Sequence, residues 1–132
     1  MDAFKIVFAT DDGTSFMDRH FGDAEYFDLY EVSTEDVQFI KRIENNAFKR
    51  DGKYAIGQKA AGIAGLFKKD NVHVLVSKKF GANINKMNTK YVCLLMNDNQ
   101  ISDSIAKIQD KFDRIKKEWD KGESRHFINL KM

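Results

Sequence analysis

The sequence predicts a single α/β domain in which helices pack on a five-stranded mixed sheet. The first half of the chain holds three strand-like segments with brief connections, which favour an antiparallel meander. The second half alternates apolar strand-like runs with helical segments, which favours parallel strands. A regular apolar stripe near the C-terminus adds a long final helix to this α/β class.

The first three strands are expected at Lys5–Thr10, Glu25–Val32 and Val37–Glu44. The first is a short apolar run that ends at Asp11-Asp12-Gly13, which is typical of a buried strand entering a turn. The second is rich in aromatic and β-branched residues. The third carries several charges, which suit an exposed sheet edge because they discourage pairing with other chains.

The following segment, Tyr54–Lys69, is predicted to be a helix because its apolar residues recur at a spacing of 3.6. Its three glycines favour a helix packed closely on the sheet, although simple tolerance of glycine explains them equally well. Val72–Ser77 and Tyr91–Met96 are continuous apolar runs, as expected of strands covered on both faces. The residues between these two runs leave room for one or two helical turns.

Beyond Ile101, apolar residues advance by four, three, four, three and four positions as far as Trp119. This spacing predicts one continuous helix of about 20 residues, closed by Gly122. The domain is therefore expected to comprise residues 1–122, and residues 123–132 form a C-terminal tail. The later half of the helix would pack on the tail or on a second subunit, and both alternatives remain open.

The amino-acid composition argues against several classes of function. The chain has 132 residues, with 22 basic and 20 acidic side chains, a balance that argues against a dedicated nucleic-acid-binding protein. Its single cysteine, Cys93, excludes an internal disulfide and a four-cysteine metal site made by one chain. No apolar stretch approaches the ~20 residues that span a bilayer, and the N-terminus does not resemble a secretory signal. We therefore expect a soluble, cytoplasmic protein.

The expected strand order is 3-2-1-4-5, which places a topological switch point between the first and fourth strands. Ligands of open α/β sheets bind outside the carboxyl ends of the strands at such a point. The segment 11–23 leaves the first strand there, and Ser77-Lys78-Lys79 leaves the fourth. Because hairpin loops usually have 2–5 residues, the long segment 11–23 is predicted to be a folded binding loop, with Gly13 and Gly22 supplying backbone freedom.

The side chains at this switch point limit its chemistry. His20 offers an imidazole nitrogen, and Lys78 and Lys79 offer positive charge. Carboxylates come from Asp11, Asp12, Asp18 and Asp23. Such a set could bind an anionic metal cluster or a phosphorylated molecule. It contains no evident pair of nucleophile and base, so a non-enzymatic binding role is favoured.

Three other candidate ligands have simpler explanations. Cys93 lies in the apolar run Tyr91–Met96 and is expected to be a small buried hydrophobe. His73 is expected to be a packed or surface-facing strand residue, and His126 belongs to the tail.

Several segments together resemble a known family. KIVFATDDG, HFGDAEYFDLYEV, the Gly/Ala-rich helix, VHVLVS and a Phe-Gly-Ala loop are similar in motif and order to the dinitrogenase iron-molybdenum cofactor biosynthesis family. This family includes the NifX-like domain that is also found at the end of NifB, and the resemblance covers about residues 4–108. It implies a three-layer, ribonuclease H-like fold.

The resemblance also implies a function. The better understood members bind, carry or protect metal-cluster precursors, so an iron-sulfur or iron-molybdenum type cluster is the implied ligand and a cluster-delivering protein the implied partner. His20, Phe21 and Gly22 correspond to the HFG motif of the family, and His20 is the implied metal ligand. Where relatives carry a glycine-rich turn after the fourth strand, this chain is bulkier and more basic but keeps Gly81.

Two alternatives remain beside the carrier role. One is an interaction or regulatory protein of the same fold without a cluster, acting through its C-terminal helix, which could also form a homodimer. The other is a metal-dependent nuclease, whose chemistry needs several carboxylates around the metal ions. The predicted helix Tyr54–Lys69 has no acidic residue, and Lys78 and Lys79 would repel cations.

Overall fold

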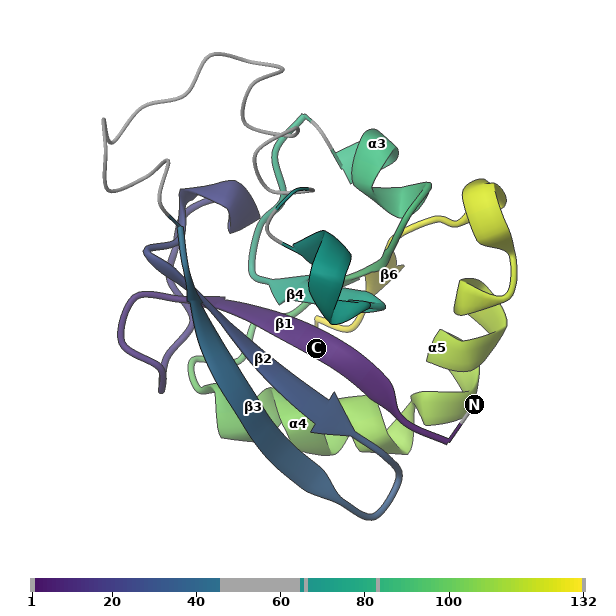
Figure 1. The fold of residues 1–132 in the computed structure, drawn as a ribbon, viewed down its shortest axis with the longest axis horizontal. Helices are drawn as coiled ribbons and strands as arrows, with labels where there is room; N and C mark the ends of the chain where they lie inside the picture. Colours follow the sequence, from purple (N-terminus) through teal and green to yellow (C-terminus); the bar gives the residue numbers. More distant parts are fainter. Residues whose placement is uncertain (1, 46–64, 66, 83, 132) are drawn as a thin grey trace.

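The computed structural model describes residues 2–45, 65, 67–82 and 84–131. Within these residues six strands form one mixed sheet in the order β3-β2-β1-β4-β5-β6 (Figure 1). The strands are β1 (Phe4–Thr10), β2 (Tyr26–Val32), β3 (Val37–Glu44), β4 (Val74–Ser77), β5 (Val92–Leu95) and β6 (Ile128–Asn129). The helical elements are η1 (Phe21–Asp23), η2 (Lys68–Asp70), α3 (Ile84–Asn88), α4 (Ile101–Asp110), α5 (Phe112–Trp119) and η3 (Gly122–Ser124).

The sheet has an antiparallel half and a parallel half that meet at β1. Strand β1 pairs antiparallel with β2 and parallel with β4, so Phe8 lies between Asp28 of β2 and Val76 of β4. Strands β4, β5 and β6 are parallel to one another. The predicted order 3-2-1-4-5 and the switch point between β1 and β4 are therefore confirmed.

The prediction of five strands is wrong, because the tail supplies a sixth. Ile128 and Asn129 pair with Leu94 and Leu95 of β5, and the N–H of Leu130 donates to the carbonyl of Leu95 at 2.9 Å. Ile128 is only 2% exposed, so the tail packs on its own domain. A two-residue strand is too short to carry an alternating pattern, and only its contact with β5 makes it a strand.

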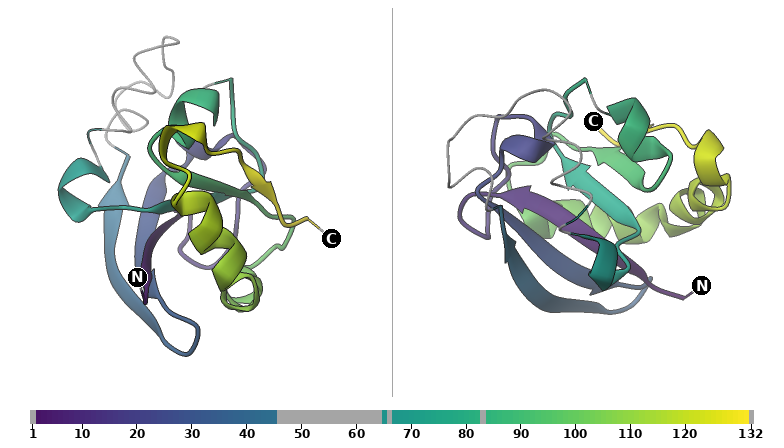
Figure 2. Two further views of the ribbon diagram at one scale, coloured as in Figure 1. Left: turned by 90° about the vertical axis from the view of Figure 1, so that its right-hand side faces the viewer. Right: turned by 45° about the horizontal axis from the view of Figure 1, so that its top comes forward.

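Buried apolar clusters lie on both faces of the sheet, and Figure 2 shows α4 and α5 along one of these faces. One face packs on α4 and α5 through a core that includes Phe8, Val76 and Ile108. The other face packs on Phe67 and on the partly buried side chains of α3, through a core that includes Phe21 and Cys93. The α/β class with helices packed on a mixed sheet is as predicted, whereas the three-layer, ribonuclease H-like assignment stays a prediction.

The predicted continuous C-terminal helix is interrupted at Lys111, whose φ of −103° and ψ of 19° separate α4 from α5. Figure 1 shows α5 turning away from the direction of α4. The apolar stripe nevertheless stays buried through Ile108 and Ile115. The sheet twists beneath the helices, so the bend lets both halves of the stripe keep contact with it.

The predicted helix over Tyr54–Lys69 lies almost entirely outside the described residues. Gly65 and Phe67 are helical, and η2 follows them. In the described part of the chain, no helix is long and apolar enough to cross a membrane.

Candidate functional site

Three loops meet at the carboxyl ends of the parallel strands. The N–H of Phe21, in the loop after β1, donates to the carbonyl of Lys79 after β4 at 2.8 Å. The N–H of Phe16 donates to the carbonyl of Asn99 after β5 at 2.9 Å, and the N–H of Ile101 donates to the carbonyl of Thr14 at the same distance. The predicted meeting of the first two loops is confirmed, and the third loop joins them.

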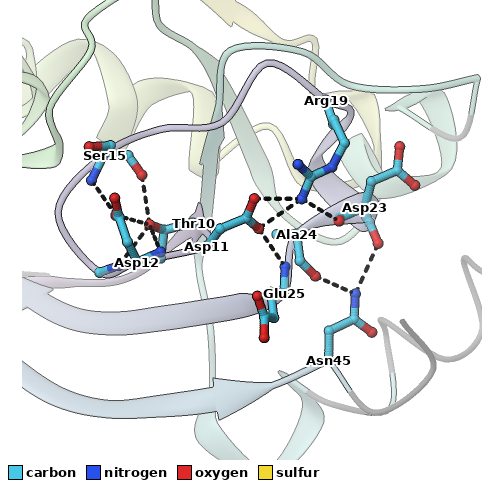
Figure 3. Close-up of polar contacts among 11 residues, drawn as sticks. Thr10, Asp11, Asp12, Ser15, Arg19, Asp23, Ala24, Glu25 and Asn45 are labelled. Carbon is cyan, nitrogen blue, oxygen red and sulfur yellow. Dashed lines mark hydrogen bonds and ion pairs between the residues drawn. The ribbon is translucent and has the colours of Figure 1, made fainter. Parts of the chain in front are cut away.

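Asp12 shapes the start of the loop after β1 (Figure 3). Its Oδ1 accepts the N–H groups of Thr14 and Ser15, each at 2.8 Å. The hydroxyl of Thr10 donates to the carbonyl of Ser15 at 2.6 Å and accepts the N–H of Gly13 at 3.0 Å. The donation by Ser15 and Thr14 lowers the pKa of the Asp12 carboxyl. Asp12 therefore holds the turn in its ionised form.

Asp11 fixes the far end of the same loop. Its carboxylate accepts the Arg19 guanidinium at 2.7 Å and 2.8 Å, and its Oδ1 accepts the N–H of Glu25 at 2.9 Å (Figure 3). The side-chain amide of the buried Asn45 donates to the carbonyls of Gly22 and Ala24, both at 2.9 Å. The two predicted carboxylates thus hold the loop that presents His20.

The two glycines of the loop after β1 differ in backbone conformation. Gly13 has a φ of +85°, as its predicted role requires, and a Cβ there would meet the Arg42 guanidinium. Gly22 lies in η1 and is not among the glycines with positive φ. The prediction that Gly22 supplies backbone freedom is therefore wrong.

Phe21 anchors the loop in the core. It is fully buried and stacks between Phe27, with ring centroids 4.9 Å apart, and Phe80, with centroids 5.3 Å apart. Burial of such a side chain contributes about 2–3 kcal/mol. Because Phe21 follows His20 directly, its anchoring restricts where the histidine can lie.

His20 is exposed and lies beside the loop after β4. Its backbone forms a parallel bridge with Lys79. A Cβ built on Gly81 would be 3.4 Å from its Nδ1, so the imidazole lies against the backbone of Gly81. The structure thus brings three of the predicted site residues together.

Two ammonium groups of the loop after β4 contact Asp18, two residues before this histidine. Lys78 Nζ donates to Oδ1 of Asn99 at 3.0 Å and lies 3.5 Å from Oδ1 of Asp18, while Lys79 Nζ donates to the carbonyl of Asp18 at 3.3 Å. The Asp18 side chain is 82% exposed, so this long ion pair offsets little of the positive charge. Sequence reasoning missed Asn99, although its place after the carboxyl end of β5 was a usable signal.

The remaining candidate ligands lie elsewhere. Cys93 is fully buried, and burial raises the pKa of its thiol to about 12, as expected for a packed hydrophobe. His73 is half-buried and its Nδ1 accepts the N–H of Lys5 at 2.9 Å. Among the described residues, no group of three or more His, Cys, Asp or Glu side chains could hold a metal ion. His20 thus stays a candidate ligand, and the ammonium groups of Lys78 and Lys79 contact Asp18, two residues before it.

A mixed α/β sheet whose loops after β1, β4 and β5 meet at the switch point defines a small α/β domain. The chain belongs to the dinitrogenase iron-molybdenum cofactor family, whose sequence model matches residues 3–111. The match contains all three site loops and ends between α4 and α5, so α5 and β6 lie outside it.

The fold is also found in a solved structure, that of a candidate dinitrogenase from Methanocaldococcus jannaschii. The two chains share 17% sequence identity with a TM-score of 0.59, over 83% of this chain and 90% of the other. At this identity the likeness concerns the fold alone. None of the curated proteins compared with the chain matches it.

Proposed function

We propose that this protein is a small, non-enzymatic carrier of an anionic metal cluster, of the iron-sulfur or iron-molybdenum cofactor precursor type. The observation that supports it most is the exposed His20 imidazole, which lies against Gly81 in the loop whose Lys78 and Lys79 ammonium groups contact Asp18. Membership of the dinitrogenase iron-molybdenum cofactor family supports the choice of cargo. In this proposal the cluster is cargo that a delivering protein supplies and a recipient removes.

The donor set fits such a cargo. A cluster with bridging sulfides carries negative charge, which Lys78 and Lys79 offset at close range. Gly81 has no side chain, so it adds no bulk beside the exposed imidazole. One imidazole supplies one bond to a metal of the cluster. Charge and hydrogen bonds hold the rest of the cluster, or the His20 of a second chain supplies a second bond. Weak binding suits a carrier, because the carrier must release the cluster to the recipient.

The loop geometry supports this role. Asp11 and Asp12 hold the loop through Arg19 and through backbone N–H groups, and Phe21 anchors it. His20 is therefore presented from a preorganised loop, which lowers the entropic cost of binding. Phe21 and Gly22 contribute to the site by positioning His20.

The test is anaerobic reconstitution of the full chain with ferrous iron and sulfide, followed by visible absorption and by iron and sulfide analysis. We expect the wild-type chain to bind a cluster and His20→Ala to bind it at least about tenfold more weakly, because even groups that merely orient a metal ligand are worth 10–100-fold. His126→Ala is the matched control, since His126 is also exposed but lies in the tail.

The charge contribution is tested separately. The double variant Lys78→Met, Lys79→Met keeps the aliphatic stems and should weaken cluster binding, and added salt should weaken the wild type more than this variant. Equal iron uptake by wild type and His20→Ala would remove His20 from the mechanism. A wild-type chain that takes up no iron and sulfide at all would contradict the carrier proposal.

A further inference from the structure

A cavity lies at the opposite end of the sheet from His20. Its volume is about 310 Å³, and its walls include Phe67, His73, Tyr91 and Trp119. His73 enters β4, Tyr91 enters β5, and Trp119 ends α5. The cavity is therefore at the amino ends of the parallel strands, whereas the His20 site is at their carboxyl ends.

The walls are largely aromatic. Phe67 and Tyr91 meet edge to face, with ring centroids 6.1 Å apart at 84°, and His73 and Trp119 do so at 4.9 Å and 88°. Phe67 and Tyr91 are only 1% and 9% exposed, so the half-buried rings of His73 and Trp119 offer most of the flat surface, which favours a flat, apolar ligand body. The volume is at the lower end of the ~300–1,000 Å³ of pockets that hold organic ligands.

The polar groups of the cavity favour negative charge. Lys68 and Lys90 line it, and none of the described residues that line it is Asp or Glu. Within the part of the chain that the structure describes, neither ammonium group has a carboxylate within ion-pair distance. The nearby acid Asp70 is already paired, with its Oδ1 2.8 Å from Lys41 Nζ.

His73 adds a hydrogen-bond donor. Its Nδ1 accepts the N–H of Lys5 at 2.9 Å, so in the neutral ring the proton resides on Nε2. The neutral form prevails because burial, and then the charge of Lys5, lower the pKa of this histidine. The wall therefore combines two cations and one neutral donor.

We propose that this cavity binds a small organic anion with a flat apolar body, of the aromatic carboxylate class. Its aromatic rings pack against the body, and Lys68, Lys90 and His73 contact the carboxylate. This site is separate from the proposed cluster site, and neither proposal depends on the other.

Trp119 makes the test direct, because it is the one tryptophan of the chain and lies in the cavity wall. Benzoate is titrated into the full chain while tryptophan fluorescence is recorded, with calorimetry as a second readout that optical absorption cannot affect. We expect saturable binding with a Kd at or below about 1 mM, equivalent to −4.1 kcal/mol. Benzoate that causes no saturable change up to about 10 mM would overturn the proposal.

Two comparison ligands test separately the contributions of the negative charge and of the flat aromatic body. Benzamide has the same flat body without the charge, and inorganic phosphate has charge without the body. We expect both to bind at least about tenfold more weakly than benzoate, a difference of 1.4 kcal/mol. Benzamide binding as well as benzoate overturns the assignment to an anion, and phosphate binding as well overturns the assignment to an aromatic ligand.

Matched variants locate the site. Lys90→Met should weaken benzoate binding by about tenfold, whereas Lys131→Met should leave it unchanged, because Lys131 follows β6 at the other end of the sheet. His20→Ala should also leave benzoate binding unchanged. Equal affinities of Lys90→Met and wild type would overturn the assignment to this cavity.

Discussion

The imidazole of His20 lies against Gly81, so that a Cβ added to Gly81 would be 3.4 Å from Nδ1. This relationship joins the loop after β1 to the loop after β4 through side-chain and backbone contact. It differs from the situation of Gly13, where a Cβ would meet the Arg42 guanidinium and where φ is +85°. Gly13 is therefore required for its positive φ and for the space that Arg42 occupies, whereas Gly81 is in ordinary contact with the His20 ring.

Alanine substitutions at Gly81 and Gly13 should change the free energy of unfolding by different amounts. Gly81→Ala places a methyl at ordinary contact distance, so we expect a change in the free energy of unfolding below about 1 kcal/mol, of either sign. Gly13→Ala should destabilise by roughly 1–3 kcal/mol, because a non-glycine residue is strained at positive φ and Arg42 must move. Urea unfolding of both variants measures the difference. Equal losses would contradict the distinction.

The sixth strand can be tested with two neighbouring residues. Ile128 is 2% exposed and Phe127 is 46% exposed. Ile128→Ala should therefore cost about 2–4 kcal/mol of unfolding free energy, whereas Phe127→Ala should cost less than about 1 kcal/mol. Denaturant unfolding of the two variants provides the comparison. Similar values would mean that β6 is not anchored by its buried side chain.

His73 should make stability depend on pH. Burial, and then the charge of Lys5, lower the pKa of this histidine from its ordinary value of 6.5. Between pH 6.5 and the lower native pKa, the unfolded chain takes up a proton that the native chain does not, so stability falls as the pH falls. The loss is complete below the native pKa, and its slope is at most about 1.4 kcal/mol per pH unit.

His73→Gln is the variant for this test, because it removes the titration and keeps an acceptor for the Lys5 N–H. Urea unfolding at several pH values between about 5 and 8 should show a flatter profile for the variant than for the wild type. Parallel profiles would assign the pH dependence to other groups.

The single cysteine should be unreactive in the native protein. Burial raises the pKa of Cys93 from its ordinary value of 9.0 to about 12, so at pH 8 the fraction present as thiolate falls by about a thousandfold. A disulfide reagent such as Ellman's should therefore modify the native chain far more slowly than the chain in guanidinium chloride. Rapid modification of the native chain would reopen Cys93 as a candidate metal ligand.

Much of the architecture could be predicted because it depends on local patterns. β3 has the predicted bounds, and β1 and β2 differ from the prediction by one residue. The predicted fourth and fifth strands are longer than β4 and β5, because apolar residues such as Val72 continue into the core before the strand pairing begins. The order of β1 to β5 followed from connection lengths.

The candidate site was predictable only in part. The unusual length of the loop after β1 and its place at the switch point predicted a folded loop there, whereas the binding roles of His20, Lys78 and Lys79 stay predictions. Their partners Asp18 and Asn99 are contacts between segments far apart in the sequence. The supporting role of Asp11 likewise depends on Arg19, which lies eight residues away and meets it only because the loop folds back.

The sequence by itself determined the α/β class, the order of β1 to β5 and the loop that carries His20, because periodicity and loop length are local properties of the chain. The tertiary structure alone decided the sixth strand, the bend at Lys111, the meeting of the His20 ring with Gly81, and the cavity beside Trp119. Each of these features is a contact between residues that are distant in sequence, and such contacts depend on how the twisted sheet and its covering helices pack.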